Sequence, residues 1–208
     1  MENIVYKDYY VWLDEQEIND SKKNILKSAI ILFSQNGYDS TSTSQIAREA
    51  NVSEGLIFKY FKSKKELKLA IIEPIINNLL PSYSDEFITR VSNELSNIND
   101  LISYAIYDRY YFLKMNKEII IIIFNEVLHD KDMMETIIEK LKDRYQILKS
   151  YLNNLLEDKN IDTDSFIRLS FGQLLVYFLQ RFHFKVINND ENKDIDLMIN
   201  NIIRFINS

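Results

Sequence analysis

The chain has 208 residues, of which 46% are apolar and 27% charged, and its formal net charge is −6. It can therefore bury a sizeable core, and it is too apolar to be a disordered tail. Its three glycines and two prolines are too few for a β-sandwich or barrel, which needs a turn signal about every 8 to 12 residues. The composition predicts a mostly helical protein.

The residue types that are missing exclude several further classes of protein. With no cysteine there is no disulfide framework, thiolate zinc site or thiol nucleophile, and two histidines do not favour a multi-histidine metal site. The N-terminus is acidic, unlike a secretory signal. The longest aliphatic and aromatic runs, such as Ile119–Phe124, have six residues, against the roughly 20 that a membrane-spanning helix needs. We expect a soluble, cytoplasmic protein without metal, cofactor or membrane contact.

The first predicted element is an acidic, aromatic-rich extension over residues 1–20. The spacing of Tyr9, Trp12 and Leu13 permits a short amphipathic helix there, although a loose arm fits the sequence nearly as well. The main helices are expected to begin only after this extension.

A helix-turn-helix is predicted after the extension. Asp20 or Ser21 can cap a first helix, and Gly37 ends it, because only glycine takes the left-handed C-terminal conformation without a steric cost. Two short helices follow, over residues 44–50 and 54–61, joined by a tight turn. This arrangement is typical of a helix-turn-helix.

A longer helical region is predicted after the helix-turn-helix. Ser63 and Glu66 have the spacing of a capping box, which starts a helix at Lys64. Pro74 should kink or stop this helix, because proline lacks an N–H donor and clashes with the preceding turn. Six more helices are predicted at residues 84–97, 100–115, 117–129, 131–158, 163–187 and 193–207. Ile119–Phe124 could be a strand by propensity, but no second strand candidate pairs with it.

The charge of the chain is unevenly distributed. Residues 22–68 carry nine basic and four acidic side chains, a net charge of +5, which leaves −11 for the remainder. A basic segment in an acidic chain can bind a polyanion while the rest stays clear of it. On charge alone, a solvated surface explains the segment about as well.

Helical spacing divides the helix-turn-helix into a buried and an outward face. The predicted shared core consists of Ile46, Ala47, Ala50, Ile57 and Phe61. Burying these residues turns another set outward, namely Glu54, Gly55, Phe58, Lys59 and Lys62. The outward face is the one that fits a major groove.

The run from Ile25 to Leu67 resembles the N-terminal DNA-binding domain of the TetR family of bacterial helix-turn-helix transcriptional regulators. The landmarks are Leu32-Phe33, Gly37-Tyr38, Ile46-Ala47, Val52-Ser53, Tyr60-Phe61 and Lys64. The resemblance implies an all-α fold. It places a DNA-binding domain of three short helices at residues 21–67 and a helical effector-binding and dimerisation domain at residues 68–208.

The resemblance also implies residues that bind DNA. Thr43 and Ser53 should contact phosphates, for which helix N-termini are suited. Gly55 lies where the backbone approaches DNA. Lys59 is expected to bind a guanine edge or a phosphate, and Lys64 to bind a phosphate. Tyr60 is expected at the same interface.

Two DNA-binding positions depart from the family pattern. Phe58 replaces a frequent tyrosine, so a contact to a thymine methyl is expected in place of a phosphate contact. Glu54 repels phosphate, but it can accept from cytosine N4 or stabilise the helix N-terminus by about 0.3 to 1 kcal/mol. We prefer the second interpretation of Glu54, because it needs no partner.

The C-terminal region has two apolar faces that suggest a homodimer. One face comprises Phe166, Leu169, Leu174, Phe178 and Phe182, and the other Ile195, Ile199, Ile202 and Ile206. By resemblance, two such helices from each subunit form a four-helix interface. An intramolecular core accounts for part of either face.

An aromatic stripe predicts a ligand pocket. Tyr104, Tyr107, Tyr111 and Met115 follow each other at helical spacing. Such a stripe is more often plain core than a ligand site, but each buried phenol without a partner costs about 1 to 3 kcal/mol. A cavity removes that cost, with Phe124, Met133 and Phe178 as further walls and a small, largely apolar or aromatic ligand.

The predicted function is a ligand-responsive transcriptional regulator, a repressor released from its double-stranded DNA operator by a small-molecule effector. The alternatives are an activator of the same fold and a helical protein-interaction module, although the latter leaves the basic segment unexplained. An enzyme is not favoured, because Glu118, Glu126 and His129 have no nucleophile beside them. No catalytic residue is therefore assigned.

Overall fold

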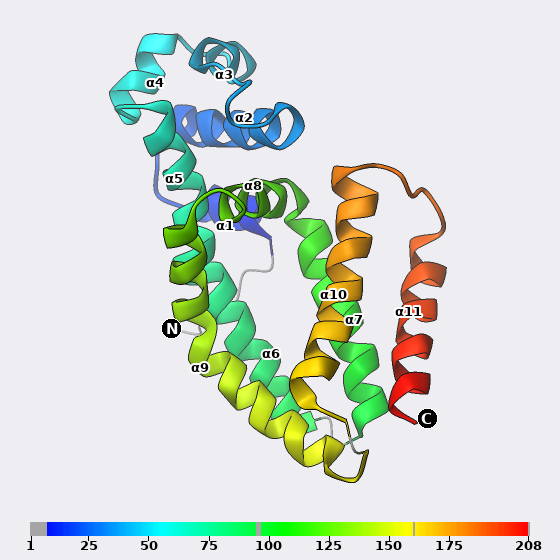
Figure 1. Ribbon diagram of the computed structural model, residues 1–208. Helices are drawn as coiled ribbons and strands as arrows, with labels where there is room; N and C mark the ends of the chain where they lie inside the picture. The colour runs from blue at the N-terminus through cyan, green and yellow to red at the C-terminus, as the bar shows by residue number, and fades with distance from the viewer. Residues whose placement is uncertain (1–7, 95–96, 160, 208) are drawn as a thin grey trace. The chain divides into compact units, whose positions relative to one another are not determined.

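The computed structural model describes residues 8–94, 97–159 and 161–207, and the regular elements in these ranges are all helical (Figure 1). The α-helices are α1 (Tyr9–Glu15), α2 (Asp20–Asn36), α3 (Thr43–Glu49), α4 (Glu54–Tyr60), α5 (Lys64–Pro74), α6 (Leu80–Glu94), α7 (Ile98–Met115), α8 (Lys117–Val127), α9 (Lys131–Leu156), α10 (Thr163–Phe178) and α11 (Glu191–Ile206). The predicted all-α fold is confirmed. Within the described ranges, no helix is both long and apolar enough to cross a membrane.

The described residues form two compact units, each with its own hydrophobic core. The first unit takes the described residues of Met1–Tyr83 together with Met115–Lys140, and so contains α1 to α5 and α8. The second takes Ser84–Lys114 with Leu141–Ser208, and contains α10, α11 and most of α6 and α7. The first unit extends past residue 67, so α5 and α8 share a core with the helix-turn-helix.

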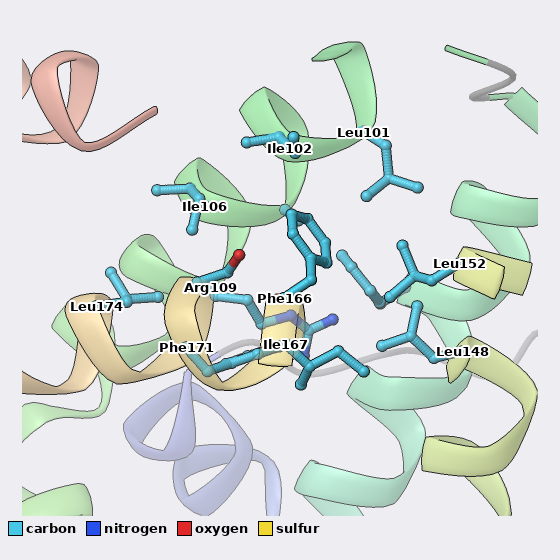
Figure 2. Close-up of a pocket in the computed structure, with 13 residues that line it drawn as sticks. Leu101, Ile102, Ile106, Arg109, Leu148, Leu152, Phe166, Ile167, Phe171 and Leu174 are labelled. Carbon is cyan, nitrogen blue, oxygen red and sulfur yellow. The ribbon is translucent and has the colours of Figure 1, made fainter. Parts of the chain in front are cut away.

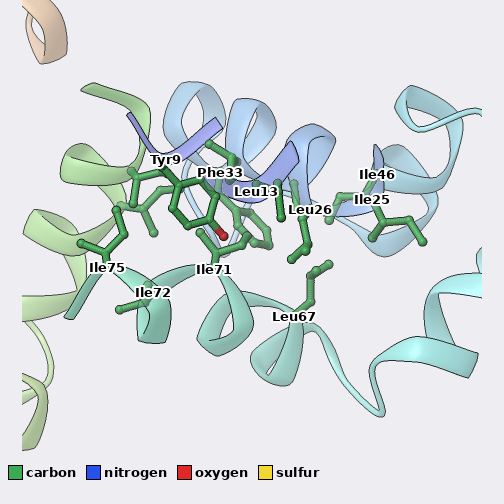
Figure 3. Close-up of a cluster of buried hydrophobic side chains, with 14 of the residues drawn as sticks. Tyr9, Leu13, Ile25, Leu26, Phe33, Ile46, Leu67, Ile71, Ile72 and Ile75 are labelled. Carbon is green, nitrogen blue, oxygen red and sulfur yellow. The ribbon is translucent and has the colours of Figure 1, made fainter. Parts of the chain in front are cut away.

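Helix α1 packs into the core of the first unit, which confirms the helix expected from Tyr9, Trp12 and Leu13. Tyr9 and Leu13 are fully buried, and Figure 3 shows them between α2 and α5, close to Ile71. The backbone N–H of Tyr9 donates to Oδ1 of the buried Asn116 at 2.9 Å. The described part of the extension is therefore an integral part of this core.

Side-chain caps begin two further helices of this unit, with small differences from prediction. Asn19, one residue earlier than expected, caps α2 by accepting from the N–H of Ser21 at 2.8 Å. Ser63 caps α5 as predicted, accepting from the N–H of Glu66 at 3.1 Å. The Glu66 carboxylate reaches back to the N–H of Lys62 at 2.8 Å, where a standard capping box would use Ser63.

The chain remains helical beyond Pro74. Ile75–Leu79 forms a π-helical turn, and α6 follows it directly. Proline supplies no N–H donor, and the wider π-helical turn accommodates a local disruption of the helical hydrogen bonds. The helix predicted from residue 84 therefore begins at Leu80, and residues 95 and 96 of its predicted end lie outside the described residues.

The later helices follow the predicted pattern closely. The segment Ile119–Phe124 lies within α8, which confirms a helix in place of a strand. The helix predicted over residues 163–187 ends earlier, in a π-helical turn at Leu179–His183. Lys185 has a φ of 55°, a left-handed conformation that does not continue a right-handed helix.

Candidate nucleic-acid interface and effector pocket

Local hydrogen bonds define the helix-turn-helix. Ser42 Oγ accepts from the N–H of Gln45 at 3.2 Å while Gln45 Oε1 accepts from the N–H of Ser42 at 2.7 Å, a capping box at the start of α3. Ser53 Oγ accepts from the N–H of Leu56 at 3.3 Å and caps α4. In the turn between them Asn51 has a φ of 54°, which asparagine tolerates well. Short-range contacts therefore define where α3 and α4 begin and how the chain turns between them.

The predicted division of this motif into a core and an outward face is confirmed. The shared core of Ile46, Ala47, Ala50, Ile57 and Phe61 is buried. The outward residues Glu54, Gly55, Phe58, Lys59 and Lys62 are exposed. Phe58 is 48% exposed. The outward face of α4 is thus accessible to a partner.

Thr43 and Glu54 form a contact that sequence reasoning missed. The Thr43 hydroxyl donates to Oε1 of Glu54 at 2.5 Å, which joins the first turns of α3 and α4. Both residues were predicted separately at the DNA-binding face. Nothing in their spacing of eleven positions indicates that their side chains form a hydrogen bond. A hydroxyl does not neutralise the carboxylate, so Glu54 keeps a negative charge at the outward face.

Two lysines of the basic segment form hydrogen bonds with other groups of the protein. Lys64 Nζ donates to the carbonyl oxygens of Tyr38 at 2.8 Å and Thr41 at 2.9 Å, and lies 4.2 Å from the centre of the Tyr38 ring. Lys68 Nζ donates to both carboxylate oxygens of Glu126 at 2.5 and 2.6 Å, and contacts the same ring at 4.3 Å. These lysines stabilise the fold, and the net charge of the segment overstates the charge available to a polyanion.

The other predicted interface residues lie around α4. Ser53 is exposed but its Oγ serves as the helix cap. Tyr60 is half-buried, with its ring edge-on to Phe61 at 6.4 Å between centroids. At Gly55 an added Cβ would meet nothing within 4 Å. The protein itself therefore does not require glycine at this position.

The predicted aromatic stripe on α7 is not the buried face of that helix. The buried residues of α7 are Leu101, Ile102, Ile106, Tyr110 and Phe112. In the predicted stripe, Tyr111 and Met115 are each 49% exposed. Tyr104 and Tyr107 are half-buried, and their hydroxyls donate to Asp108 at 3.4 Å and Asp196 at 2.5 Å. The argument from unpaired phenols is therefore wrong, because nearby carboxylates accept their hydrogen bonds.

A cavity lies elsewhere in the second unit. Its wall comes from α6, α7, α9 and α10, and includes Phe87, Ile106, Leu152 and Phe166 (Figure 2). Its volume is about 40 Å³, room for about three water molecules at about 10 to 15 Å³ each. None of the seven predicted ligand residues lines it. Of these, Phe178 is fully buried beside Phe182 in the second unit, while Met115, Phe124 and Met133 belong to the first.

The apolar face predicted on the last helix is part of the intramolecular core. Ile195, Ile199, Ile202 and Ile206 are all buried in the second unit, so this part of the predicted interface is wrong. The face lies against the other helices of the unit because its spacing gives one continuous buried stripe. On the predicted α10 face, Phe166, Leu174 and Phe178 are buried too.

Glu118, Glu126 and His129 do not form a reactive group. Glu126 is paired with Lys68, and the His129 ring nitrogen Nδ1 lies 2.7 Å from the carbonyl oxygen of Asn125. In the described ranges, no cluster of three or more histidine, aspartate or glutamate residues could hold a metal ion.

Known proteins match both the sequence and the fold. Residues 25–71 match the family described as "Bacterial regulatory proteins, tetR family". Over 185 residues the chain is 29% identical to the uncharacterised HTH-type transcriptional regulator YvkB of Bacillus subtilis (strain 168), with 85% of this chain and 92% of YvkB covered.

Solved structures share the fold at lower identity. The fatty acid degradation regulator FadR from Bacillus halodurans has 17% identity and a TM-score of 0.62, with 92% of this chain and 96% of that chain covered. The transcriptional regulator FadR from Bacillus subtilis, solved in complex with stearoyl-CoA, has 19% identity and a TM-score of 0.59, with 88% and 96% covered.

The motif, the fold and these matches define a helix-turn-helix transcriptional regulator, which is a class of DNA-binding protein and not an enzyme. Residues 25–71 of the chain match the DNA-binding domain of the TetR family.

Proposed function

We propose that this regulator is a homodimeric repressor that occupies a double-stranded DNA operator in the cytoplasm and leaves it when a small molecule binds. The observation that carries the proposal is the exposed face of α4, with Phe58 and Lys59 accessible on a helix whose other face is buried. Residues 21–67 would bind DNA, and residues 68–208 would bind the effector and the second subunit.

The DNA contacts are assigned by chemistry. Lys59 can bond a guanine edge or a phosphate, and Phe58 can contact a thymine methyl. Gly55 allows the backbone to approach DNA. Thr43, Ser53, Tyr60 and Lys64 would contact the phosphate backbone, although Thr43 and Lys64 first have to exchange their partners within the protein for phosphate.

Support for an effector comes from the cavity of the second unit and from the relatives. The B. subtilis FadR structure holds stearoyl-CoA, so a small molecule binds a protein of this fold. In this chain we propose that the effector binds in the apolar cavity between α6, α7, α9 and α10. It replaces the pocket that the tyrosine stripe predicted on α7.

The dimer is proposed to form through exposed side chains of α10 and α11. Leu175 and Val176 on α10 are 40% and 53% exposed, and Leu197 on α11 is 59% exposed. They lie off the buried stripes of their helices. Apolar side chains of this size are commonly covered in an oligomer interface. Two subunits would present two α4 helices to half-sites about 34 to 36 Å apart, or a multiple of that distance.

An electrophoretic mobility shift against the promoter of the protein's own gene tests the proposal. A repressor should give a discrete complex that resists competitor DNA. Expression of a reporter gene driven by that promoter should rise when the regulator's gene is deleted. Reporter expression that falls when the regulator's gene is deleted would favour an activator of the same fold. The absence of any specific complex would favour a protein-interaction module.

A further inference from the structure

Two polar side chains interrupt the apolar wall of the second unit's cavity, Arg109 from α7 and Ser170 from α10. Ser170 is 8% exposed, and its Oγ has no hydrogen-bond partner within the described residues. A buried hydroxyl without a partner is costly to a fold. This hydroxyl is placed to donate to a group that enters the cavity.

Arg109 brings a guanidinium group, which is paired with Asp108, to the same wall. Its guanidinium carbon lies 3.8 Å from the centre of the Phe87 ring, and Nε lies 3.6 Å from Oδ2 of Asp108. The side chain is 13% exposed, and Figure 2 shows it among the apolar side chains between α7 and α10. Guanidinium groups form charge-assisted hydrogen bonds with carboxylates, and these are stronger where water is excluded. Such a wall favours an anionic group over a neutral one of the same shape.

We infer that the effector is a small monocarboxylic acid with an apolar chain or ring, whose carboxylate lies inside the cavity between Arg109 and Ser170. The inference rests on the proposed function in taking the cavity's ligand to be the effector. The carboxylate would accept hydrogen bonds from both side chains, while the apolar part contacts residues such as Ile106 and Phe166.

The burial of these two groups also distinguishes a free acid from its CoA thioester. A thioester has no anionic carboxylate to place beside Arg109 in the cavity wall. The ligand class therefore differs from the stearoyl-CoA found in B. subtilis FadR. Even a short acid exceeds the present space, so its binding has to widen the gap between α7 and α10.

Isothermal titration calorimetry on the full chain tests this assignment. The probes are butyrate, benzoate, octanoate and dodecanoate, each compared with the alcohol and the CoA thioester of the same chain or ring, such as octanol and octanoyl-CoA for octanoate. At least one acid should bind, and it should bind about tenfold or more tightly than its counterparts of the same chain. Failure of every acid to bind, or equal binding of octanol and octanoate, would overturn the inference.

Variants locate the site. Ser170→Ala removes one oxygen that has no partner, so the protein should fold as well as the wild type while its affinity for the acid falls about tenfold or more. Arg109→Met keeps an unbranched apolar stem and removes the charged guanidinium group, and should abolish the preference for acid over alcohol. Ser103→Ala and Arg144→Met are matched controls outside the cavity wall. Unchanged acid affinity in Ser170→Ala contradicts the inference, even if Arg109→Met does not fold.

The same probes separate this inference from the proposed function. A mobility shift measured at a saturating concentration of the acid should show loss of the DNA complex. If the acid binds as described but DNA stays bound, the proposed release mechanism fails and the cavity assignment stands. If a neutral molecule releases DNA while no acid binds, the inference fails and the proposed function stands.

Discussion

Gly55 lies in the first turn of α4, where an added Cβ would meet nothing within 4 Å. Alanine is more favourable than glycine in a helix by up to about 1 kcal/mol. Gly55→Ala is therefore expected to leave the free energy of unfolding unchanged or to raise it slightly, and to weaken DNA binding if the backbone approaches DNA here. Urea unfolding and fluorescence anisotropy with operator DNA measure the two effects. Gln146→Ala, at an exposed position of α9, should leave DNA affinity unchanged.

Tyr9 is fully buried, and its hydroxyl has no hydrogen-bond partner within the described residues. Because such a hydroxyl costs about 1 to 3 kcal/mol, Tyr9→Phe should maintain or increase the free energy of unfolding. Tyr110 is equally buried, but its hydroxyl donates to Glu191. Tyr110→Phe should therefore be destabilising, by about 1 kcal/mol or more. Equal effects of the two substitutions in urea unfolding would contradict this account.

Glu54 contributes a negative charge to the proposed DNA-binding face, and Thr43 donates a hydrogen bond to it. If the carboxylate serves the helix N-terminus, Glu54→Gln should strengthen binding to all DNA sequences alike, because one repulsion with phosphate is removed. If it reads cytosine N4, the substitution should change base preference at one operator position. Binding-site selection with both proteins distinguishes these results, and we expect the first.

At the scale of elements, local signals made the helices predictable. Serine caps and helical spacing identify α3, α4 and α5, and the buried stripe of Ile46 and Ile57 follows from the same spacing. The cavity was not predictable, because its wall combines residues of four helices that are far apart in the sequence. The stripe on α7 was misread because its hydroxyls find partners such as Asp196, 89 positions away. Contacts between distant residues leave no periodic signal in a single sequence.

The ion pair between Lys68 on α5 and Glu126 on α8 lies largely buried in the first unit, with side-chain exposures of 8% and 17%. Removing one partner of a buried pair typically costs about 3 to 5 kcal/mol, because the other charge is left uncompensated. Lys68→Met and Glu126→Leu should each lower the free energy of unfolding by an amount of this order. The double variant should recover much of that loss. An additive loss in urea unfolding would show that the two charges are not coupled.

At the scale of the whole molecule, DNA binding is proposed to depend on a homodimer formed by α10 and α11. Val176→Glu and Leu197→Glu place charges on exposed apolar positions, and should shift the protein to a monomer in sedimentation velocity while its helix content is retained. Leu128→Glu is a matched control, because Leu128 is 63% exposed and lies next to α8. A wild-type protein that is monomeric at micromolar concentration, with or without operator DNA, would contradict the dimer.

The central claim is that the exposed face of α4 reads DNA. It is tested most directly by fluorescence anisotropy with promoter DNA, comparing the wild type with the double variant Phe58→Ala, Lys59→Ala and with Leu128→Glu. Both substituted residues of the double variant are exposed, so its fold should be retained. We predict tight, sequence-selective binding by the wild type and the control, and loss of sequence preference in the double variant, with each lost base contact costing about 1 to 3 kcal/mol. Equal affinity and selectivity in all three proteins would contradict the account.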